Sequence, residues 1–486
     1  MHLGLDLGTS GVKAVLTDDV GAIAAQATAP LTVSRPRPGW SEQDPASWWD
    51  ALVQSVEALR ESHDLSGVRG IGLSGQQHGA VLLDARDHVL RPAILWNDGR
   101  SAAECAPLDP LARQIAGNLA MPGFTAPKLL WVRGHEPEVF RATSRVLLPK
   151  DWLRLCLVGD AVSEPSDASG TLWLDVAARR WSPALLEATG LDERHMPRLV
   201  EGDAVSGRLR AEAAAELGLP PGIPVAGGAG DNAAGAAGIG CVRPGQGFVS
   251  LGTSGVVFVC DAGPKPAPER AVHAFCHCLP QTWHRMSVIL SAAGSLAWFA
   301  GVSGVPEAEL LAEMEREKEG VGDVTFLPYL SGERTPHNDA QARGAFLGLD
   351  AGTTRAALTR AVLEGVAFAL ADGLDALSPG GLPDEALWVI GGGGRSAAWL
   401  RILAAATGRV LLPVAGAEAG PALGAARLAR AACGDAPADA YPVPPAQPQV
   451  EPEPGLVERL APRRAAFRRL YPLLRPEFAA RSAVTA

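Results

Sequence analysis

The sequence predicts an α/β protein made of two similar domains. Short apolar segments alternate with Ala- and Leu-rich stretches along the chain, a pattern of strands alternating with helices. The six residues 7–12 (LGTSGV) recur letter for letter at 251–256. The chain of 486 residues is long enough for two or three domains. We expect two related domains that face each other, residues 1–240 and 241–486, divided near Gly240.

Each copy of the repeat lies between segments of β type and is predicted to be a hairpin turn. Glycines let the backbone bring N–H groups close to an anion, and hydroxyl groups add donors. A single copy is more simply explained as an ordinary hairpin. Two identical copies in facing domains favour binding of a polyphosphate from both sides. Neither copy has the Lys-Ser/Thr ending of a Walker A loop. The turn residues are Gly8, Thr9, Ser10, Gly252, Thr253 and Ser254.

Asp6 directly precedes the first turn. A carboxylate at the end of a first strand, beside phosphates, is a typical ligand of Mg²⁺, often through water. A turn-capping aspartate is the alternative. A helix is then predicted after Asp44, which can cap it, with Pro45 at its first position. The apolar residues at helical spacing are Trp48, Leu52, Val56 and Leu59.

A polar loop follows the predicted strand at 70–73 and contains Gln76, Gln77 and His78. Such side chains, with exposed backbone N–H groups, can hydrogen-bond a polyol. A single histidine in a loop is also often structural. The loop is a candidate sugar site with that alternative open.

Asp231 lies in the glycine-dense stretch 227–232, after a predicted strand at 223–226 and before a helix of small residues. Crowding by glycines favours close approach of a ligand. Asp231 would then be a general base that takes a proton from a substrate hydroxyl, as in kinases. The alternative is a helix N-cap.

Four glycines, 391–394, follow a predicted strand at 386–390 and precede a helix beginning at Arg395 and Ser396. Glycines at the carboxyl end of a strand suit a flat ligand lying against the backbone. A tight crossover is the alternative.

A group of cysteines and histidines near the middle of the chain resembles a zinc site in composition only: His273, Cys276, His277, Cys278 and His284. Residues 271–279 are predicted to form a strand, which places Cys276 and Cys278 on one face and His277 on the other. No second CxxC or HxxxH pair completes a site, so we expect no structural zinc.

The composition narrows the class of protein. With 43 Lys and Arg against 53 Asp and Glu and no basic run, the chain has no electrostatic footprint for nucleic acid or for an anionic membrane. Neither a signal peptide nor a spanning helix is predicted, and seven sparse cysteines do not suggest a disulfide framework, so we expect a cytoplasmic protein. The Pro-rich stretch 436–454 is predicted to be an irregular connector before a basic helix near 456–470, with the last ten residues frayed.

Taken together, these motifs resemble those of the FGGY family of carbohydrate kinases over nearly the whole chain. The resemblance rests on residues 1–13, 39–45, 94–100, 250–255, 326–337 and 390–396. It implies two actin-like (ribonuclease H-like) ATPase domains facing a central cleft, with the sugar mainly on the first and ATP mainly on the second. The expected sugar is D-xylulose, on the strength of residues 74–79, 96–100 and 230–232, although many bacterial relatives carry Met at Gln77. A kinase of ribulose or glycerol, a non-catalytic sensor and a chaperone-type ATPase are the alternatives.

The resemblance also implies a role for each site residue. Asp231 would deprotonate the sugar's terminal hydroxyl, and Asp6 would lie beside Mg²⁺. The sugar would lie against Gln76, Gln77, His78, Asp231 and Asn232. ATP would lie against Gly8, Thr9, Ser10, Lys13, Gly252, Thr253, Ser254, Gly392, Gly393, Gly394 and Ser396. The oligomeric state is left open, with a homodimer as one option.

Overall fold

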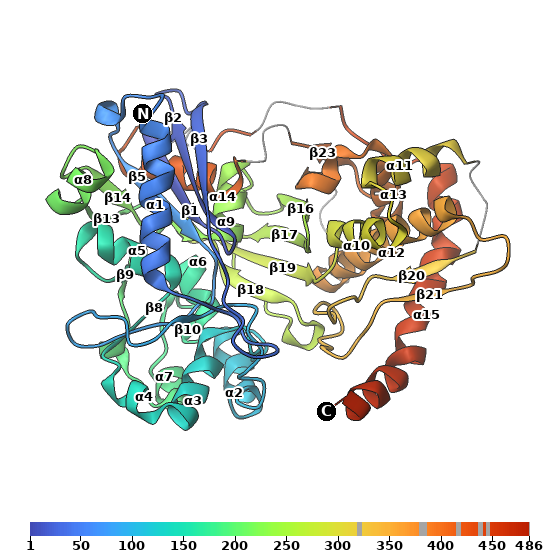
Figure 1. Ribbon diagram of the computed structural model, residues 1–486, viewed down its shortest axis with the longest axis horizontal. Helices are drawn as coiled ribbons and strands as arrows, with labels where there is room; N and C mark the ends of the chain where they lie inside the picture. Colours follow the sequence, from blue (N-terminus) through green and yellow to red (C-terminus); the bar gives the residue numbers. More distant parts are fainter. Residues whose placement is uncertain (318–322, 379–385, 415–418, 436–440, 444–447, 486) are drawn as a thin grey trace.

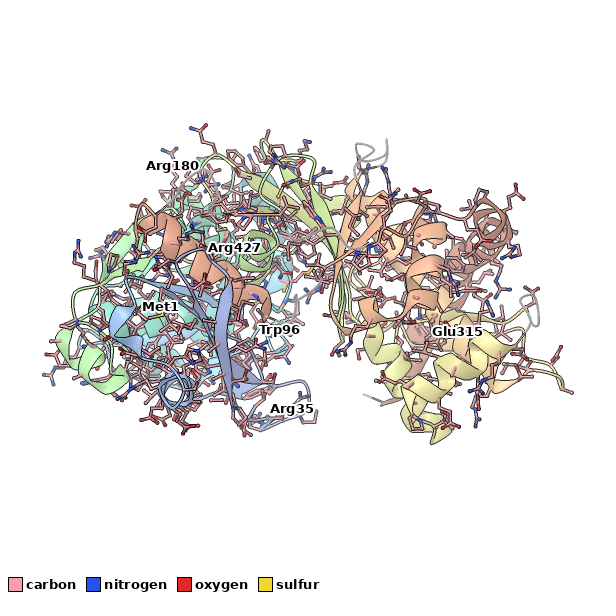
Figure 2. The ribbon with its side chains drawn as sticks, turned by 90° about the horizontal axis from the view of Figure 1, so that it is seen from above. Met1, Arg35, Trp96, Arg180, Glu315 and Arg427 are labelled. Atoms are coloured by element: carbon pink, nitrogen blue, oxygen red, sulfur yellow. The ribbon has the colours of Figure 1, made fainter. Side chains whose placement is uncertain are left out.

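The computed structural model describes residues 1–317, 323–378, 386–414, 419–435, 441–443 and 448–485. Two α/β halves lie side by side, the N-terminal half in blue to green and most of the C-terminal half in yellow to red (Figure 1). Seen from above, Met1 and Trp96 lie in one half and Glu315 lies in the other (Figure 2). No described helix is long and apolar enough to cross a membrane.

The first sheet has the strand order β13-β14-β5-β1-β2-β3, and β15 also pairs with β5. β1 runs parallel to β5 and antiparallel to β2, which is antiparallel to β3. The strands are β1 (His2–Leu7), β2 (Gly11–Thr17), β3 (Ile23–Pro30), β5 (Ile71–Gly75), β13 (Val205–Arg208), β14 (Pro224–Ala226) and β15 (Ala229–Gly230).

The second sheet has the order β18-β19-β17-β16-β22-β23 and repeats this pattern. β16 runs parallel to β22 and antiparallel to β17, which is antiparallel to β19. Its strands are β16 (Gly247–Leu251), β17 (Gly255–Asp261), β18 (His273–Cys276), β19 (Trp283–Ile289), β22 (Leu387–Ile390) and β23 (Leu411–Pro413). Both predicted hairpin turns are confirmed, and the repeated sequence occupies the same place in two sheets of matching topology.

Short two-stranded ladders complete the β-structure. They pair β4 (Glu42–Gln43) with β7 (Ala93–Ile94), β6 (Val81–Leu83) with β8 (Arg145–Leu147), β9 (Val162–Ser163) with β12 (Arg198–Leu199), β10 (Leu174–Asp175) with β11 (Arg180–Trp181), and β20 (Thr325–Leu327) with β21 (Ala345–Leu347). β18 ends at Cys276, so the predicted strand at 271–279 is too long, and Cys278 lies beyond the ladder.

The helices of the first half begin with α1 (Pro45–Arg60). Asp44 accepts a hydrogen bond from the Ala46 N–H, and Trp48, Leu52, Val56 and Leu59 are buried, as predicted. The other helices before β16 are α2 (Cys105–Leu111), α3 (Thr125–His135), α4 (Pro137–Ala142), α5 (Pro149–Val158), α6 (Pro165–Ala168), α7 (Pro183–Thr189), α8 (Ala211–Leu217) and α9 (Asp231–Gly238).

The helices after β16 are α10 (Ala293–Ser303), α11 (Glu307–Arg316), α12 (Arg355–Leu377), α13 (Ala397–Thr407), α14 (Gly420–Ala432) and α15 (Pro454–Thr485). Within the Pro-rich stretch 436–454, residues 436–440 and 444–447 lie outside the described part of the chain. The C-terminal helix is longer at both ends than the predicted 456–470. It continues to Thr485, within the last ten residues, which we expected to be frayed.

One helix of the C-terminal half lies on the first sheet. α14 packs against α9, β1 and β5 (Figure 1). Glycines make this close approach possible, because a Cβ at Gly4 would lie 1.9 Å from the Ala422 carbonyl oxygen and one at Gly72 would lie 1.8 Å from that of Ala425. A division of the chain at residue 240 assigns α14 to the second domain, but α14 packs on the sheet of the first half.

Each sheet has its own apolar core, and a third core joins the two halves. This third cluster contains Leu82 and Phe124 from the first half and Phe258 and Phe275 from the second, all of them buried. The two halves are therefore held together by packed apolar side chains, beside the site described next.

Candidate active site

Two carboxylates lie at one edge of the first sheet. β1 and β15 flank β5, with Asp6 opposite Ser74 and Gly230 opposite Gly75. Since the three strands run parallel, their carboxyl ends meet at the same edge. Asp6 is the next-to-last residue of β1 and Asp231 directly follows β15, so their main chains are about two strand spacings apart across the sheet, roughly 9.5 Å.

Asp231 is the first residue of α9, and Gly230 is the N-cap. The alternative that Asp231 is the helix N-cap is therefore wrong. Its Oδ1 accepts hydrogen bonds from the backbone N–H of Asn232 (2.7 Å) and from the Asn232 amide (2.9 Å). Its Oδ2 has no hydrogen-bond partner among the described residues. Burial, and then the negative charge of Asp6, raise the pKa of Asp231 to about 7.

Asp6 accepts a hydrogen bond from the Ser74 hydroxyl (2.8 Å) and lies opposite Lys13 in the β1–β2 ladder. Burial raises the pKa of Asp6, while the Ser74 hydrogen bond and the Lys13 charge act in the opposite direction. The negative charge of Asp6 disfavours ionisation of Asp231, and a divalent cation at Asp6 would relieve this effect. A carboxylate is an oxygen donor of the kind that Mg²⁺ prefers.

The first turn is braced through Thr9. The Thr9 hydroxyl donates to the Gln76 side chain (3.0 Å) and accepts from the Trp96 indole (2.9 Å), while the Gln43 amide donates to the Thr9 carbonyl (2.8 Å). The Gln76 amide in turn donates to the Gln43 side chain (3.1 Å). Both ends of the buried Gln76 side chain are thus used inside the protein, and it supports the turn. Neighbouring Ser10 is exposed.

We expected the segment 96–100 beside the substrate. Trp96 braces the first turn, and Asp98 and Arg100 have a structural role. The Arg100 guanidinium pairs with Asp98 (2.7 Å) and Glu42 (2.7 Å), and the Asp98 carboxylate also accepts from the backbone N–H of Ser41 (2.6 Å). These charges are buried and neutralise one another.

His78 is held in a left-handed backbone conformation, with φ 67°, that costs energy for a residue with a side chain. Its carbonyl accepts from Lys128 Nζ (2.7 Å) and from the Thr125 hydroxyl (3.1 Å), which fixes this conformation. Its Nδ1 lies 2.7 Å from the Gly170 carbonyl and must donate to it, which leaves Nε2 as an acceptor. Burial lowers the pKa of His78 to about 3, and the charges of Lys128 and Arg334 act in the same direction.

Ser166, which the sequence did not single out, joins the sugar loop to Asp231. Its carbonyl accepts from the Gln77 amide (3.1 Å), and its hydroxyl accepts from the backbone N–H of Gly230 (3.1 Å). The same hydroxyl donates to the buried Glu164 carboxylate (2.8 Å). Gln77 is thus connected through Ser166 to the turn that carries Asp231. A lone serine gives no signal in the sequence that would reveal this connection.

The second turn and the glycine turn share a pocket of about 600 Å³ in the second half. Gly252, Thr253, Gly392, Gly393 and Ser396 line it, together with the first turn of α10. The other residues predicted to contact ATP are not part of its lining: Gly8, Thr9, Ser10 and Lys13 of the first half, and Ser254 and Gly394 of the second. Gly391 has φ +89°, and a Cβ there would lie 2.7 Å from the Leu251 carbonyl carbon, so only glycine lets the two turns touch.

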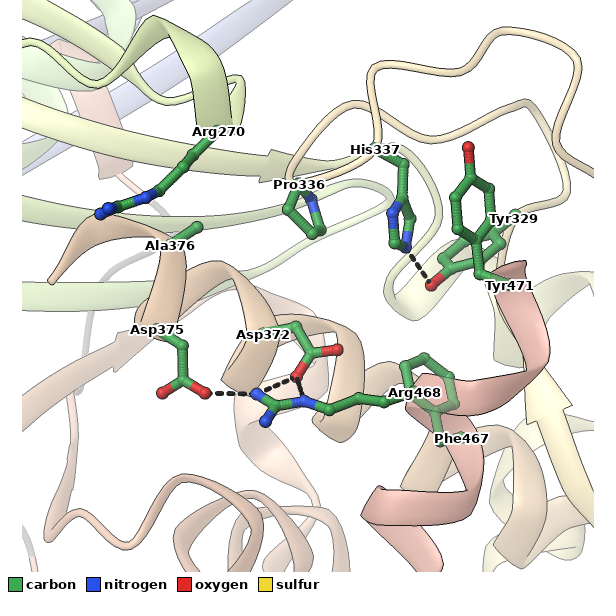
Figure 3. Close-up of a pocket in the computed structure, with 10 residues that line it drawn as sticks. All are labelled: Arg270, Tyr329, Pro336, His337, Asp372, Asp375, Ala376, Phe467, Arg468 and Tyr471. Atoms are coloured by element: carbon green, nitrogen blue, oxygen red, sulfur yellow. Dashed lines mark hydrogen bonds and ion pairs between the residues drawn. The ribbon is translucent and has the colours of Figure 1, made fainter. Parts of the chain in front are cut away.

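A second pocket of about 590 Å³ lies elsewhere in the second half, among the loop at 329–337, α12 and α15 (Figure 3). Its charged groups are already paired. Arg468 bridges Asp372 and Asp375, and the Tyr329 hydroxyl lies 3.1 Å from His337 Nε2. The glycine turns are absent from its lining, so the pocket that they do line is the better candidate for a nucleotide.

The cysteines and histidines near residue 276 are tied to separate partners. Cys276 Sγ donates to the Val176 carbonyl and Cys278 Sγ donates to the Ala233 carbonyl. Within the described parts of the chain, the one grouping of three potential metal ligands is His2, Cys433 and Asp435, where the Asp435 carboxylate is already paired with Arg69 (3.1 Å).

Two matching α/β halves each carry a Thr-Ser hairpin turn; the first adds the carboxylates Asp6 and Asp231, and the second adds a glycine-lined pocket. This arrangement defines a nucleotide-dependent phosphotransferase of the actin-like ATPase fold. Residues 1–238 match the N-terminal domain of the FGGY family of carbohydrate kinases, and residues 247–433 match its C-terminal domain. The chain belongs to this family.

The similarity to characterised relatives extends over nearly the whole chain. It is 51% identical to the xylulose kinase of Escherichia coli K12 over 484 residues, 98% of this chain and 99% of that protein. The crystal structure of a xyloylose kinase from Brucella ovis superposes with a TM-score of 0.93 at 52% identity, covering 98% of this chain and 99% of that one. A xylulose kinase from Rhodospirillum rubrum matches at 31% identity with a TM-score of 0.89, over 98% and 99% of the two chains.

Proposed function

We propose that the chain transfers the γ-phosphoryl group of ATP to the terminal hydroxyl of D-xylulose, giving D-xylulose 5-phosphate and ADP. One observation carries the chemistry: the Asp231 carboxylate has one oxygen held by Asn232 and the other unpartnered among the described residues, and Ser166 connects the adjacent Gly230 to Gln77 of the sugar loop. The sugar assignment rests on 51% identity to xylulose kinases over 98% of the chain.

In the proposed reaction, Asp231 Oδ2 accepts the proton of the sugar hydroxyl while the hydroxyl oxygen of the sugar forms a bond to the γ-phosphorus. The bond from phosphorus to the bridging oxygen of ADP breaks, and ADP leaves. The turns at Thr9 and Thr253 bind the phosphates, and the pocket at Gly392 and Gly393 binds adenosine. Asp6 would hold Mg²⁺, which supplies positive charge to the phosphates. We also propose a cytoplasmic location, because the donor is ATP.

A coupled assay of ADP formation across ketoses and polyols tests the proposal. We expect D-xylulose to give the highest kcat/KM, with ribulose and glycerol well below it. A preference for either of those would reject the sugar assignment and leave the family unchanged. An absence of ADP with every sugar would favour a non-catalytic sensor. ADP formation that is independent of sugar would favour a chaperone-type ATPase.

A further inference from the structure

A short loop of the second half brings a charged residue to the place where the two halves meet. Thr335 fixes this loop beside β18 and β19: its N–H donates to the Val288 carbonyl (3.0 Å), and its hydroxyl donates to the Ala271 carbonyl (2.8 Å). On the other side, the Glu333 carboxylate accepts from the backbone N–H of Leu290 (3.1 Å). Arg334 stands between these two anchors, so its main chain is held from both sides.

The Arg334 side chain carries a positive charge that has no direct partner among the described residues. It is half-buried, and its guanidinium makes no hydrogen bond or ion pair there. The adjacent acid, Glu333, is buried and directs its carboxylate to the backbone N–H groups of Leu290 and Arg334 instead of to the guanidinium. A cation that is partly removed from water and lacks a carboxylate partner is costly unless a ligand supplies oxygen atoms.

The guanidinium lies near the sugar loop of the first half. The Thr335 hydroxyl bonds the Ala271 carbonyl, two residues before His273, so the Arg334 loop lies beside the start of β18, and the Arg334 charge lowers the pKa of both His273 and His78. These rings belong to one aromatic cluster: the centroid of Phe124 lies 4.7 Å from that of His78 and 5.6 Å from that of His273. Arg334 therefore reaches from the second half toward a loop of the first.

We propose that Arg334 binds the sugar directly, as a residue that the second half contributes to the sugar site. Its guanidinium donates hydrogen bonds to hydroxyl or carbonyl oxygens of a ketose whose other side contacts the His78 loop. A hydroxyl both donates and accepts, so His78 Nε2 as acceptor and Arg334 as donor are complementary to one polyol. This inference rests on the proposed function and adds to it a contact that requires both halves.

The other ligand that arginine commonly binds is a phosphate. The residues assigned to the phosphates are the Thr9 and Thr253 turns and Lys13, whereas the loop that carries Arg334 is bonded through Thr335 to Ala271, two residues before His273. The two assignments predict different losses on substitution. A sugar contact weakens binding of D-xylulose in the absence of nucleotide, and a phosphate contact weakens binding of an ATP analogue.

Calorimetric titration of the full chain with D-xylulose alone, and with a non-hydrolysable ATP analogue alone, separates these assignments. We expect Arg334→Met to raise the Kd of D-xylulose about ten- to a hundredfold, the range for lost hydrogen bonds from a charged donor. The Kd of the analogue should change by less than about twofold. Arg334→Lys keeps the charge but not the forked donors and should fall between wild type and Arg334→Met.

Arg270→Met is the matched control, because Arg270 lines the pocket on the Pro336 and His337 side of the same loop (Figure 3). It should leave the Kd of D-xylulose within about twofold of wild type. If Arg334→Met does not fold, as judged by its melting curve, Arg334→Gln provides the same comparison.

A Kd for D-xylulose within about twofold of wild type in the neutral Arg334 variants would overturn the inference, as would a loss confined to the nucleotide analogue. If the wild type itself binds another ketose or polyol in preference to D-xylulose, the proposed function fails on that result alone. The same variants titrated with the preferred sugar then decide the role of Arg334 separately.

Discussion

At the scale of single residues, Asp231 is the group on which the proposed chemistry depends. Asn232 fixes one of its oxygens, and its raised pKa of about 7 makes it a base suited to neutral pH. Its position at the start of α9 also exposes it to the positive end of the helix, which favours the ionised form. Asp6 opposes this through its own negative charge.

We expect Asp231→Ala to lower kcat by about 10²–10⁴, the usual contribution of a general base. Sugar affinity and melting temperature should change far less, because the N-cap of α9 is Gly230 and the hydrogen bonds lost are only those from the neighbouring Asn232. The measurements are kcat, the Kd of D-xylulose and Tm on this variant. A variant that keeps more than about a tenth of the wild-type kcat would show that another group is the base.

The raised pKa of Asp231 also predicts two effects of pH. In the free enzyme, kcat/KM for the sugar should fall about tenfold per pH unit below about pH 7, because the base becomes protonated. The folded state holds this proton more tightly than the unfolded state, whose aspartate pKa is 3.8, so the carboxyl's contribution to stability is lost as pH rises from about 4 to about 7.

Asp231→Asn supplies the comparison for both effects. Its residual activity should lack the acidic limb assigned to this residue, and its free energy of unfolding should decline less than that of wild type between pH 4 and 7. Identical pH profiles in the two proteins would assign the titration elsewhere, with Asp6 as the first candidate.

A metal analysis addresses the two candidate ion sites at the same scale. Because Cys276 and Cys278 bond separate backbone carbonyls, we expect no stoichiometric zinc, and because Asp6 and Asp231 fit a divalent cation, we expect activity to require Mg²⁺. Elemental analysis after dialysis against a chelator, followed by an assay with and without added Mg²⁺, checks both. About one zinc per chain would contradict the first expectation.

The site residues that could be predicted from the sequence stand in local motifs that are typical of a function. The residues that could not be predicted have roles that depend on how the chain packs. The glycine turns and Asp231 stand in distinctive local patterns. Ser166 becomes informative only when the chain brings its hydroxyl to the Gly230 N–H, and Arg334 only when Thr335 fixes its loop beside β18. Gln76 lies in the predicted loop, but its side chain is used in bracing Thr9, because a buried amide must satisfy both of its polar atoms.

At the scale of secondary-structure elements, the sequence predicted the two hairpins and α1 well, because their turn, capping and periodicity signals are local. It did not predict that α14 lies on the first sheet. That placement depends on glycines far apart in the sequence: Gly4 and Gly72 remove side chains where the sheet touches α14, and Gly424 removes one where α14 touches α9. No local pattern marks such a contact.

The α9–α14 contact makes a prediction about stability. A Cβ at Gly424 would lie 1.8 Å from the Ala234 carbonyl oxygen, a backbone atom of α9 that cannot turn away. We expect Gly424→Ala to cost about 1–3 kcal/mol of unfolding free energy or more. It should also lower kcat, because α9 begins at Asp231. Denaturant unfolding and the coupled assay measure the two effects.

Gly301→Ala is the matched control for Gly424→Ala. Gly301 is also inside a helix, α10, but it is exposed, and a Cβ added there would have no neighbouring atom within 4 Å. Replacing it should stabilise the protein by about 0.5–1 kcal/mol, the difference between glycine and alanine in a helix. Equal effects of the two substitutions would mean that close packing of α14 on α9 does not decide stability.

At the scale of the whole molecule, the reacting groups are divided between two bodies. Asp231 and His78 belong to the first half, while the pocket at Gly252, Thr253 and Gly393 belongs to the second. Transfer between them needs the phosphate and the sugar hydroxyl in contact and water excluded, so that phosphate reaches the sugar. The shared apolar core and α14 keep the halves connected during such a movement.

We therefore expect the halves to close when both ligands bind, since each ligand then gains contacts to the opposite half. Small-angle scattering should show a smaller radius of gyration with D-xylulose plus a non-hydrolysable ATP analogue than with either alone. Gly393→Val provides a control, because a Cβ there would lie 2.4 Å from Leu251 Cδ2 and the pocket wall would have to shift. That variant should lose the part of the change that depends on nucleotide. An unchanged radius at saturating concentrations of both ligands would mean that the two halves already stand in the reactive arrangement, and that the step limiting water access lies in the loops around His78 and Arg334.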